Sequence, residues 1–126
     1  MEKKGIEKPY NIQDRAFEFS REIIRLYQSL YKSFSAGGSL SKQLLRSGTS
    51  IGANLEEAND GQSKPDFISK CSIALKEAKE THYWLRLFDA ESLAPKEKLQ
   101  PLIIECNEII SILITIIKKA KQNPDR

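Results

Sequence analysis

The sequence predicts an all-α fold, an antiparallel up-down-up-down bundle of four helices in one domain spanning residues 1–126. Apolar residues recur at spacings of three and four in four segments, 12–34, 40–60, 65–89 and 95–121. Short breaks rich in Gly, Pro, Ser or Asn separate the segments, so consecutive helices are expected to pack antiparallel. The length of 126 residues, with 40% hydrophobic and 29% charged residues, is that of a single globular domain.

The first two segments are separated by two glycines, and the second contains two more. The first ends at Ala36-Gly37-Gly38, after which Ser39 or Ser41 can cap the second helix. The expected apolar residues of the first are Phe17, Ile23, Ile24, Tyr27, Leu30, Tyr31 and Phe34, and those of the second are Leu40, Leu44, Ile51, Leu55 and Ala58.

Gly48 and Gly52 lie one turn apart inside the second helix, which ends at Asn59-Asp60-Gly61. Each costs a helix interior roughly 1 kcal/mol relative to alanine. Close approach of another backbone can offset that cost, so the stretch from Arg46 to Ala58 predicts a tight packing contact.

The third segment opens with Pro65 in its first turn, as helices allow, and ends near Ser92-Leu93-Ala94. Its expected core face is Phe67, Cys71, Ala74, Ala78, Leu85 and Phe88.

The fourth segment opens with Pro95 and contains a β-branched run, Ile109 to Ile117, that would suit a strand in isolation. Helical spacing persists over five turns, and the apolar residues cover an arc of roughly 200°. The helix is therefore expected to be covered on two sides, either within its own bundle or by another subunit. The residues in helical register are Leu99, Leu102, Ile103, Cys106, Ile110, Leu113 and Ile117.

Charge and cysteine content limit the environment and the partners. The formal charge of +3 permits contact with nucleic acid without requiring it. No apolar run approaches the length of a membrane span, and the first residues lack the apolar core of a signal peptide, so we expect a cytoplasmic protein without a membrane partner. Cys71 and Cys106 each fall in an apolar register and are expected to be reduced core thiols.

Polar residues with small or aromatic neighbours line the flanks of the second and third helices. A large aromatic among carboxylates suits a partly buried subunit contact in which charge pairs fix the register. The alternative is a solvated flank, with Trp84 leaning onto its own bundle. The residues assigned to subunit or helix packing are Arg46, Gly48, Ser50, Gly52, Asn54, Glu57, Glu77, Glu80 and Trp84.

A second surface could contact RNA or DNA, because cations bind phosphates and an aromatic ring can stack on a base. On the third helix this surface comprises Lys76, Lys79, Tyr83 and Arg86, and the first helix adds Arg21, Arg25 and Lys32. The alternative is ordinary solvation, since Glu18, Glu22 and Glu80 lie within helical reach of these cations.

The sequence offers no support for catalysis. His82 is the single histidine, with neither a second histidine four residues away nor a cysteine cluster. Carboxylates occur at Glu56-Glu57 and at Glu77 with Glu80, but no nucleophile or phosphate loop accompanies them. We therefore predict no catalytic residue, no cofactor and no metal.

Two blocks of the sequence resemble a known family. The stretch SGTSIGANLEEA follows a Ser-Ile-x-x-Asn-Ile-Ala-Glu-Gly pattern, in which Glu56 and Ala58 replace the Ala and Gly. The positions that match it are Ser50, Ile51, Asn54, Leu55 and Glu57. The stretch DFISKCSIALKEAKETHYWLRLF matches Ile-Ala-x-x-Glu-x-x-Glu-Thr from Ile73 to Thr81. These blocks resemble the four-helix-bundle proteins encoded in intervening sequences of bacterial 23S rRNA genes. The resemblance covers roughly residues 12–121.

This resemblance implies an antiparallel bundle that assembles as a homopentameric ring and has no known catalytic activity. A group similar in fold, the accessory variability proteins of diversity-generating retroelements, partners a reverse transcriptase and binds nucleic acid. The expected function is a noncatalytic homo-oligomeric scaffold with a nucleic-acid-binding accessory role. The alternatives are an accessory protein of a reverse transcriptase or other RNA-handling system, and, with less support, a helical enzyme. A protein partner cannot be named from the sequence.

Overall fold

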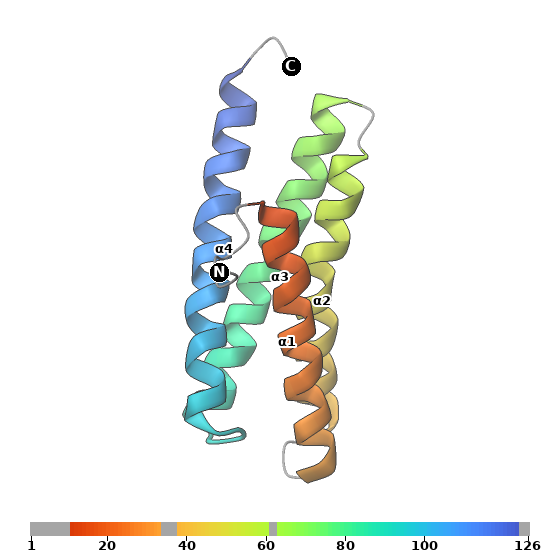
Figure 1. The fold of residues 1–126 in the computed structure, drawn as a ribbon. Helices are drawn as coiled ribbons and strands as arrows, with labels where there is room; N and C mark the ends of the chain where they lie inside the picture. The colour runs from red at the N-terminus through yellow and green to blue at the C-terminus, as the bar shows by residue number, and fades with distance from the viewer. Residues whose placement is uncertain (1–10, 34–37, 61–62, 124–126) are drawn as a thin grey trace, which may run out of the picture.

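The computed structural model describes residues 11–33, 38–60 and 63–123, without the side chains of residues 31–33. Four helices account for nearly all of these residues (Figure 1). The helices are α1 (Ile12–Ser33), α2 (Gly38–Asn59), α3 (Lys64–Ala90) and α4 (Lys96–Gln122). The predicted all-α class is confirmed, and each predicted boundary lies within two residues of the observed one. The predictions made for Ala36, Gly37 and Gly61, and for the side chains of Tyr31 and Phe34, lie outside the part of the chain that the structure describes.

The helices alternate in direction, and each packs on the next along the chain, while α4 also packs on α1 (Figure 1). Among the described residues, α1 and α3 lie diagonally across the bundle without close backbone contact. The α1–α4 pair makes the least extensive of the four helix contacts. Helix α1 begins about halfway along α4, so the upper ends of the other three helices extend beyond it (Figure 1).

The core face of α1 differs from the predicted one. Phe17 and Ile24 are 59% and 40% exposed, whereas Phe19 and Leu26, which the prediction omitted, are buried. The buried residues of this helix recur at three and four, so its own pattern marks this face, and the prediction followed a second stripe through Phe17 and Ile24. The buried residues are Ala16, Phe19, Ile23, Leu26 and Leu30. The predicted core faces of α2 and α3 are confirmed for Leu44, Ile51, Leu55, Ala58, Cys71, Ala74, Ala78, Leu85 and Phe88, which are all buried.

The residues that begin α2 and α3 can be compared with the predicted ones. The Oγ of Ser63 accepts a hydrogen bond from the backbone N–H of Asp66 at 3.2 Å, so Ser63 caps α3 and Pro65 lies in its first turn as predicted. The proposed caps Ser39 and Ser41 instead lie inside α2, which begins at Gly38.

The predicted break after α3 is a Schellman-type turn. Ser92 has a positive φ of 57°, the Leu93 N–H donates to the Phe88 carbonyl at 2.9 Å, and the Ser92 N–H donates to the Asp89 carbonyl at 3.2 Å. These two bonds satisfy carbonyls at the end of α3 and turn the chain toward α4.

Helix α4 is long and apolar enough, by length and composition, to cross a membrane. The expectation that no segment has the length and composition of a membrane span is therefore not met for α4. Its inner face is instead buried in the bundle, with Leu99, Cys106, Ile109 and Leu113 at 0% exposure. The described part of the chain leaves the outer side of α4 uncovered, since Ile104 and Ile114 are 57% and 45% exposed.

The two glycines of α2 occupy different environments. A Cβ added at Gly48 would lie 2.9 Å from Cγ1 and 3.0 Å from Cγ2 of Ile23, so Gly48 admits the α1 side chain. A Cβ at Gly52 would lie 3.5 Å from the Ala16 carbonyl oxygen, an ordinary van der Waals distance. The glycine stretch therefore packs against α1 of the same chain, and Gly48 is the position where side-chain volume is excluded.

Candidate functional site

A polar network joins the outer edges of α2 and α3. Arg46 of α2 donates from Nη1 to Oε1 of Glu77 at 3.1 Å and from Nη2 to Oε2 of Glu80. The indole N–H of Trp84 donates to the same Glu80 oxygen at 3.0 Å. The spacing of four residues between Glu80 and Trp84 places both side chains on one face of α3. Arg46, Glu77, Glu80 and Trp84 are thus brought together within one chain.

A buried hydroxyl pair lies beneath this network. The hydroxyl oxygens of Ser47 and Thr81, both 0% exposed, are hydrogen-bonded at 2.8 Å, and the Thr81 hydroxyl also donates to the Glu77 carbonyl at 2.7 Å. Since each hydroxyl carries one hydrogen, Ser47 is the donor in the shared bond when Thr81 donates to Glu77. The pair fixes the register of α2 against α3. Ser47 and Thr81 gave no separate signal in the sequence, because their pairing depends on the mutual rotation of two helices.

The network lowers the pKa of Glu80. Partial burial pushes the pKa of this carboxyl upward, but the hydrogen bonds from Trp84 and Arg46 stabilise the carboxylate and outweigh it. The same contacts raise the pKa of Arg46. The carboxylate–guanidinium pair is thus ionised over the neutral pH range.

The pKa of Glu80 is lower in the folded than in the unfolded protein, so ionised Glu80 stabilises the fold. This stabilisation is complete at pH values above the pKa of the unfolded state. It is lost as the pH falls through the pKa of the folded state. We expect the free energy of unfolding to decline between about pH 6 and about pH 3, and the decline to be shallower in Glu80→Gln. Urea unfolding at a series of pH values measures this. The control is Glu56→Gln, an exposed carboxylate of α2, whose pH profile should match the unmodified protein; equal flattening in both variants would contradict the assignment.

The remaining polar residues of the α2 flank bond mainly within their own chain. Ser50 donates to the Arg46 carbonyl at 2.7 Å, and the Asn54 amide donates to the Ser50 carbonyl at 2.9 Å. Glu57 pairs with Lys70 of α3 at 2.6 Å. The first two contacts lie within α2, and the third joins α2 to α3 of the same chain.

The predicted basic residues fall into two separate groups. Arg21 and Arg25 of α1 each pair with a carboxylate three residues earlier, Glu18 and Glu22, at 3.2 Å. Helix α1 lies diagonally across from α3, so the structure does not join these arginines to the α3 residues. Lys32 belongs to α1, but its side chain lies outside the described part of the structure.

The α3 group is exposed and contains an aromatic cluster. Lys76, Lys79 and Arg86 are exposed, and Tyr83 is 50% exposed. The Tyr83 ring meets the Trp84 ring edge-on with 5.4 Å between centroids, and the guanidinium carbon of Arg86 lies 5.7 Å from the Tyr83 centroid. The Tyr83 ring is therefore held beside cations with half of its surface open.

The histidine and the two cysteines of the chain lie partly or fully inside the bundle. His82 is half-buried, and burial together with the nearby Arg86 charge lowers its pKa. Cys71 and Cys106 are buried free thiols, as predicted, and burial raises the pKa of Cys106 to about 12. Within residues 11–33, 38–60 and 63–123, no three His, Cys, Asp or Glu side chains gather in a way that could hold a metal ion.

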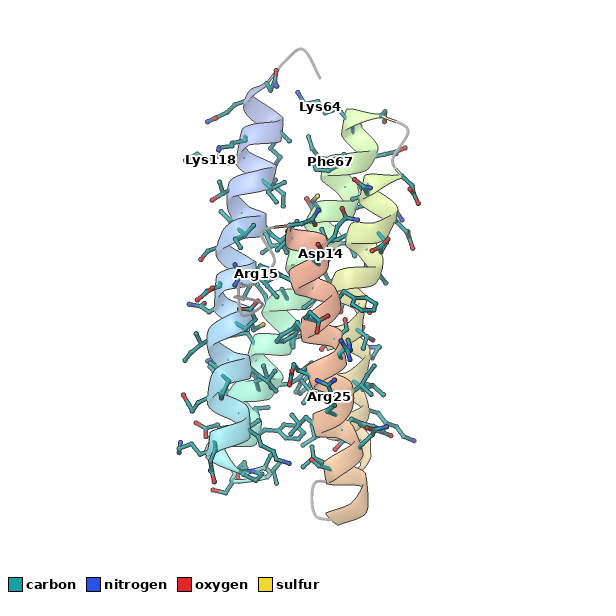
Figure 2. All side chains as sticks on the ribbon, in the orientation of Figure 1. Asp14, Arg15, Arg25, Lys64, Phe67 and Lys118 are labelled. Carbon is teal, nitrogen blue, oxygen red and sulfur yellow. The ribbon has the colours of Figure 1, made fainter. Side chains whose placement is uncertain are left out.

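Sequence reasoning missed an ionic contact between α1 and α4. Arg15 donates from Nε to Glu105 Oε2 at 2.9 Å and from Nη2 to Glu105 Oε1 at 2.7 Å, and it also donates to Glu108 at 2.5 Å. The side chain of Arg15 is 13% exposed and lies between the two helices (Figure 2). The contact joins residues 90 positions apart, for which a single sequence carries no signal.

A groove of about 670 Å³ runs beside this ionic contact, between α1 and α4. Its floor contains Phe19, Leu26 and Leu102, which are buried, and charged residues of both signs form its rim. The mixed rim favours no particular charge in a ligand.

The chain is similar to known proteins over most of its length. A family model described as 23S rRNA-intervening sequence protein matches residues 8–115. A crystal structure of a protein with unknown function from the S23 ribosomal protein family of Bacteroides thetaiotaomicron superposes with a TM-score of 0.81 at 44% sequence identity, covering 86% of this chain and 99% of that one. No curated protein matches the chain.

Proposed function

Because the chain belongs to the family of 23S rRNA-intervening sequence proteins, as its two sequence blocks predicted, we propose that it is a noncatalytic helical scaffold that assembles with copies of itself. The resemblance implies a ring of five copies, and we retain that number as part of the proposal. The related protein of known structure has no assigned function. Self-assembly is therefore inferred from the exposed surface of this chain.

The observation that supports self-assembly is an exposed apolar face on α1. Phe17 and Ile24, 59% and 40% exposed, lie two turns apart and therefore on the same side of the helix. On α2, which packs on α1, Leu45 and Thr49 are half-buried. Protruding apolar side chains next to partly exposed ones provide a surface on which another copy can pack. We call Phe17, Ile24, Leu45 and Thr49 the α1–α2 face.

This location differs from the flank of α2 and α3 suggested by the sequence. Arg46 already pairs with Glu77 and Glu80 in its own chain, so that flank has fewer groups left for a neighbour. The α1–α2 face, in contrast, leaves two large apolar side chains in contact with water.

The double substitution Phe17→Glu with Ile24→Glu is expected to convert the assembly into a monomer while leaving the helical content unchanged, because it places charges on an apolar contact without altering the core. Light scattering coupled to size-exclusion chromatography measures the mass, and circular dichroism measures the helical content. The matched control is Ile73→Glu on α3, where an isoleucine that is 38% exposed should be replaced without loss of mass. A monomeric unmodified protein at micromolar concentration would contradict the proposal.

A second candidate role is nucleic-acid binding as an accessory protein, in partnership with a reverse transcriptase or another RNA-handling protein. The exposed α3 group supports it, because Lys76, Lys79 and Arg86 offer cations beside the half-exposed ring of Tyr83. The two roles are compatible, since a ring would present one copy of this group from each subunit.

A further inference from the structure

The carboxylates of α3 and α4 are directed away from the seam between these two helices. On α3, Glu77 and Glu80 pair with Arg46 of α2. On α4, Glu105 and Glu108 pair with Arg15 of α1. The acidic groups in the middle of both helices therefore neutralise cations on the other two helices.

The seam itself is located by two contacts at its lower end. Asp89 of α3 accepts hydrogen bonds from Lys96 at 2.9 Å and from Gln100 at 3.3 Å, both on α4. Helical spacing from Asp89 and Gln100 gives the residues that follow along the same edge of each helix. On α3 they are Arg86, His82, Lys79 and Leu75, and on α4 they are Ile103, Asn107, Ile110, Ile114 and Lys118. We call these residues the α3–α4 seam.

The seam carries positive charge without acidic partners. Lys79, Arg86 and Lys118 are exposed, and no ion pair to any of them occurs within residues 11–33, 38–60 and 63–123. Lys118 points away from the bundle (Figure 2). Asp89 is the acidic residue at the lower end of the seam, and it is already paired with Lys96. Three cations without acidic partners among the described residues therefore lie along one edge of the molecule.

Apolar side chains lie between these cations. Ile103 and Ile110 are half-buried, Ile114 is 45% exposed, and Tyr83 stands next to the seam with half of its ring open. A ligand that contacts the seam only through phosphates would leave these apolar side chains in contact with water. A single strand also presents base faces that can pack on them. A duplex keeps its bases stacked inside, so the seam suits a single strand better.

We propose that the α3–α4 seam binds single-stranded nucleic acid, with phosphates at Lys79, Arg86 and Lys118 and a base stacked on Tyr83. The inference rests on the proposed nucleic-acid role and extends it from α3 to α4. From Gln100 to Lys118 the seam spans about 27 Å at 1.5 Å per helical residue. A strand of several nucleotides fits this length, in the range of site sizes found for small domains that bind single strands.

The test is fluorescence anisotropy of the full-length protein with a labelled single-stranded RNA of about 12 nucleotides and with a duplex of the same length, at several salt concentrations. The double variant Lys79→Glu with Lys118→Glu is expected to weaken single-strand binding at least about tenfold and to flatten the salt dependence by roughly two phosphate contacts. Tyr83→Ala is expected to weaken binding by about fivefold or more, with the salt dependence retained. The matched control, Lys42→Glu with Lys98→Glu, removes two exposed lysines outside the seam and should change affinity by less than about threefold.

The outcomes distinguish a failure of the seam from a failure of the nucleic-acid role. Absence of binding to either nucleic acid at low salt would overturn the nucleic-acid role together with the seam. Binding that weakens equally in the control, or that favours the duplex, would overturn the seam and leave the nucleic-acid role standing. Binding to anionic lipid vesicles in place of RNA would overturn both, since a basic and apolar edge can also meet a membrane surface.

Discussion

Gly48→Ala is expected to lower the free energy of unfolding by about 1–2 kcal/mol, whereas Gly52→Ala is expected to raise it by up to about 1 kcal/mol. The two glycines lie one turn apart in the same helix, and the chemical change is identical. The opposite signs follow from what each new methyl group would meet.

At Gly48 the methyl carbon would lie 2.9 Å from Cγ1 and 3.0 Å from Cγ2 of Ile23, closer than carbon atoms pack. Ile23 is fully buried, and its β-branched side chain has little rotational freedom in a helix. Relief therefore requires α1 and α2 to separate, which disturbs the packing on both sides of the contact. Overpacking of this kind costs about 1–3 kcal/mol, more than alanine gains in helix propensity.

At Gly52 the methyl carbon would lie 3.5 Å from the Ala16 carbonyl oxygen and 3.6 Å from its Cβ. These are ordinary contacts, so the helix-propensity gain of alanine dominates. Urea unfolding of both variants, compared at a concentration where each has the mass of the unmodified protein, measures the two changes. Destabilisation by both substitutions, or by neither, would show that the Ile23 contact does not distinguish the glycines.

The sequence was sufficient for the helices because their signals are local. The three-and-four spacing, Pro65 in the first turn of α3 and the break near Ser92 each act within a few residues, and the structure confirms them. The core faces of α2 and α3 were also predicted, although α3 carries further apolar residues outside its core face, such as the exposed Ile73 and Tyr83.

The sequence was insufficient where two helices must be rotated relative to each other. In α1 two apolar stripes pass through the adjacent Ile23 and Ile24, and the structure buries the stripe of Ile23 and leaves Ile24 exposed. The pairs Ser47–Thr81 and Arg15–Glu105 are likewise tertiary, joining residues 34 and 90 positions apart. Among the candidate site residues, the sequence brought Arg46, Glu77, Glu80 and Trp84 into one group, but it could not assign their contacts to one chain.

Arg15→Met is expected to lower the free energy of unfolding by about 1–3 kcal/mol, because it removes three charge-assisted hydrogen bonds between α1 and α4. Arg15→Lys should lose a smaller part of that stability, since an ammonium keeps the charge but cannot make the two-pronged contact with Glu105. The solvent exposure of Glu108, 48%, keeps the loss below that of a fully buried ion pair.

Hydrogen exchange measured for each helix tests whether Arg15 stabilises the protein by holding α1 against α4. The α1–α4 contact is the least extensive in the bundle, so α1 should open locally before the other helices once Arg15 is replaced. Hydrogen exchange should therefore accelerate in the first turns of α1 by a larger factor than in α3, where Ser47 and Thr81 remain bonded. Arg25→Met, which removes an exposed pair within α1, is the matched control and should leave exchange in α1 nearly unchanged. Equal acceleration in every helix would mean that Arg15 stabilises the bundle as a whole rather than fastening α1 to α4.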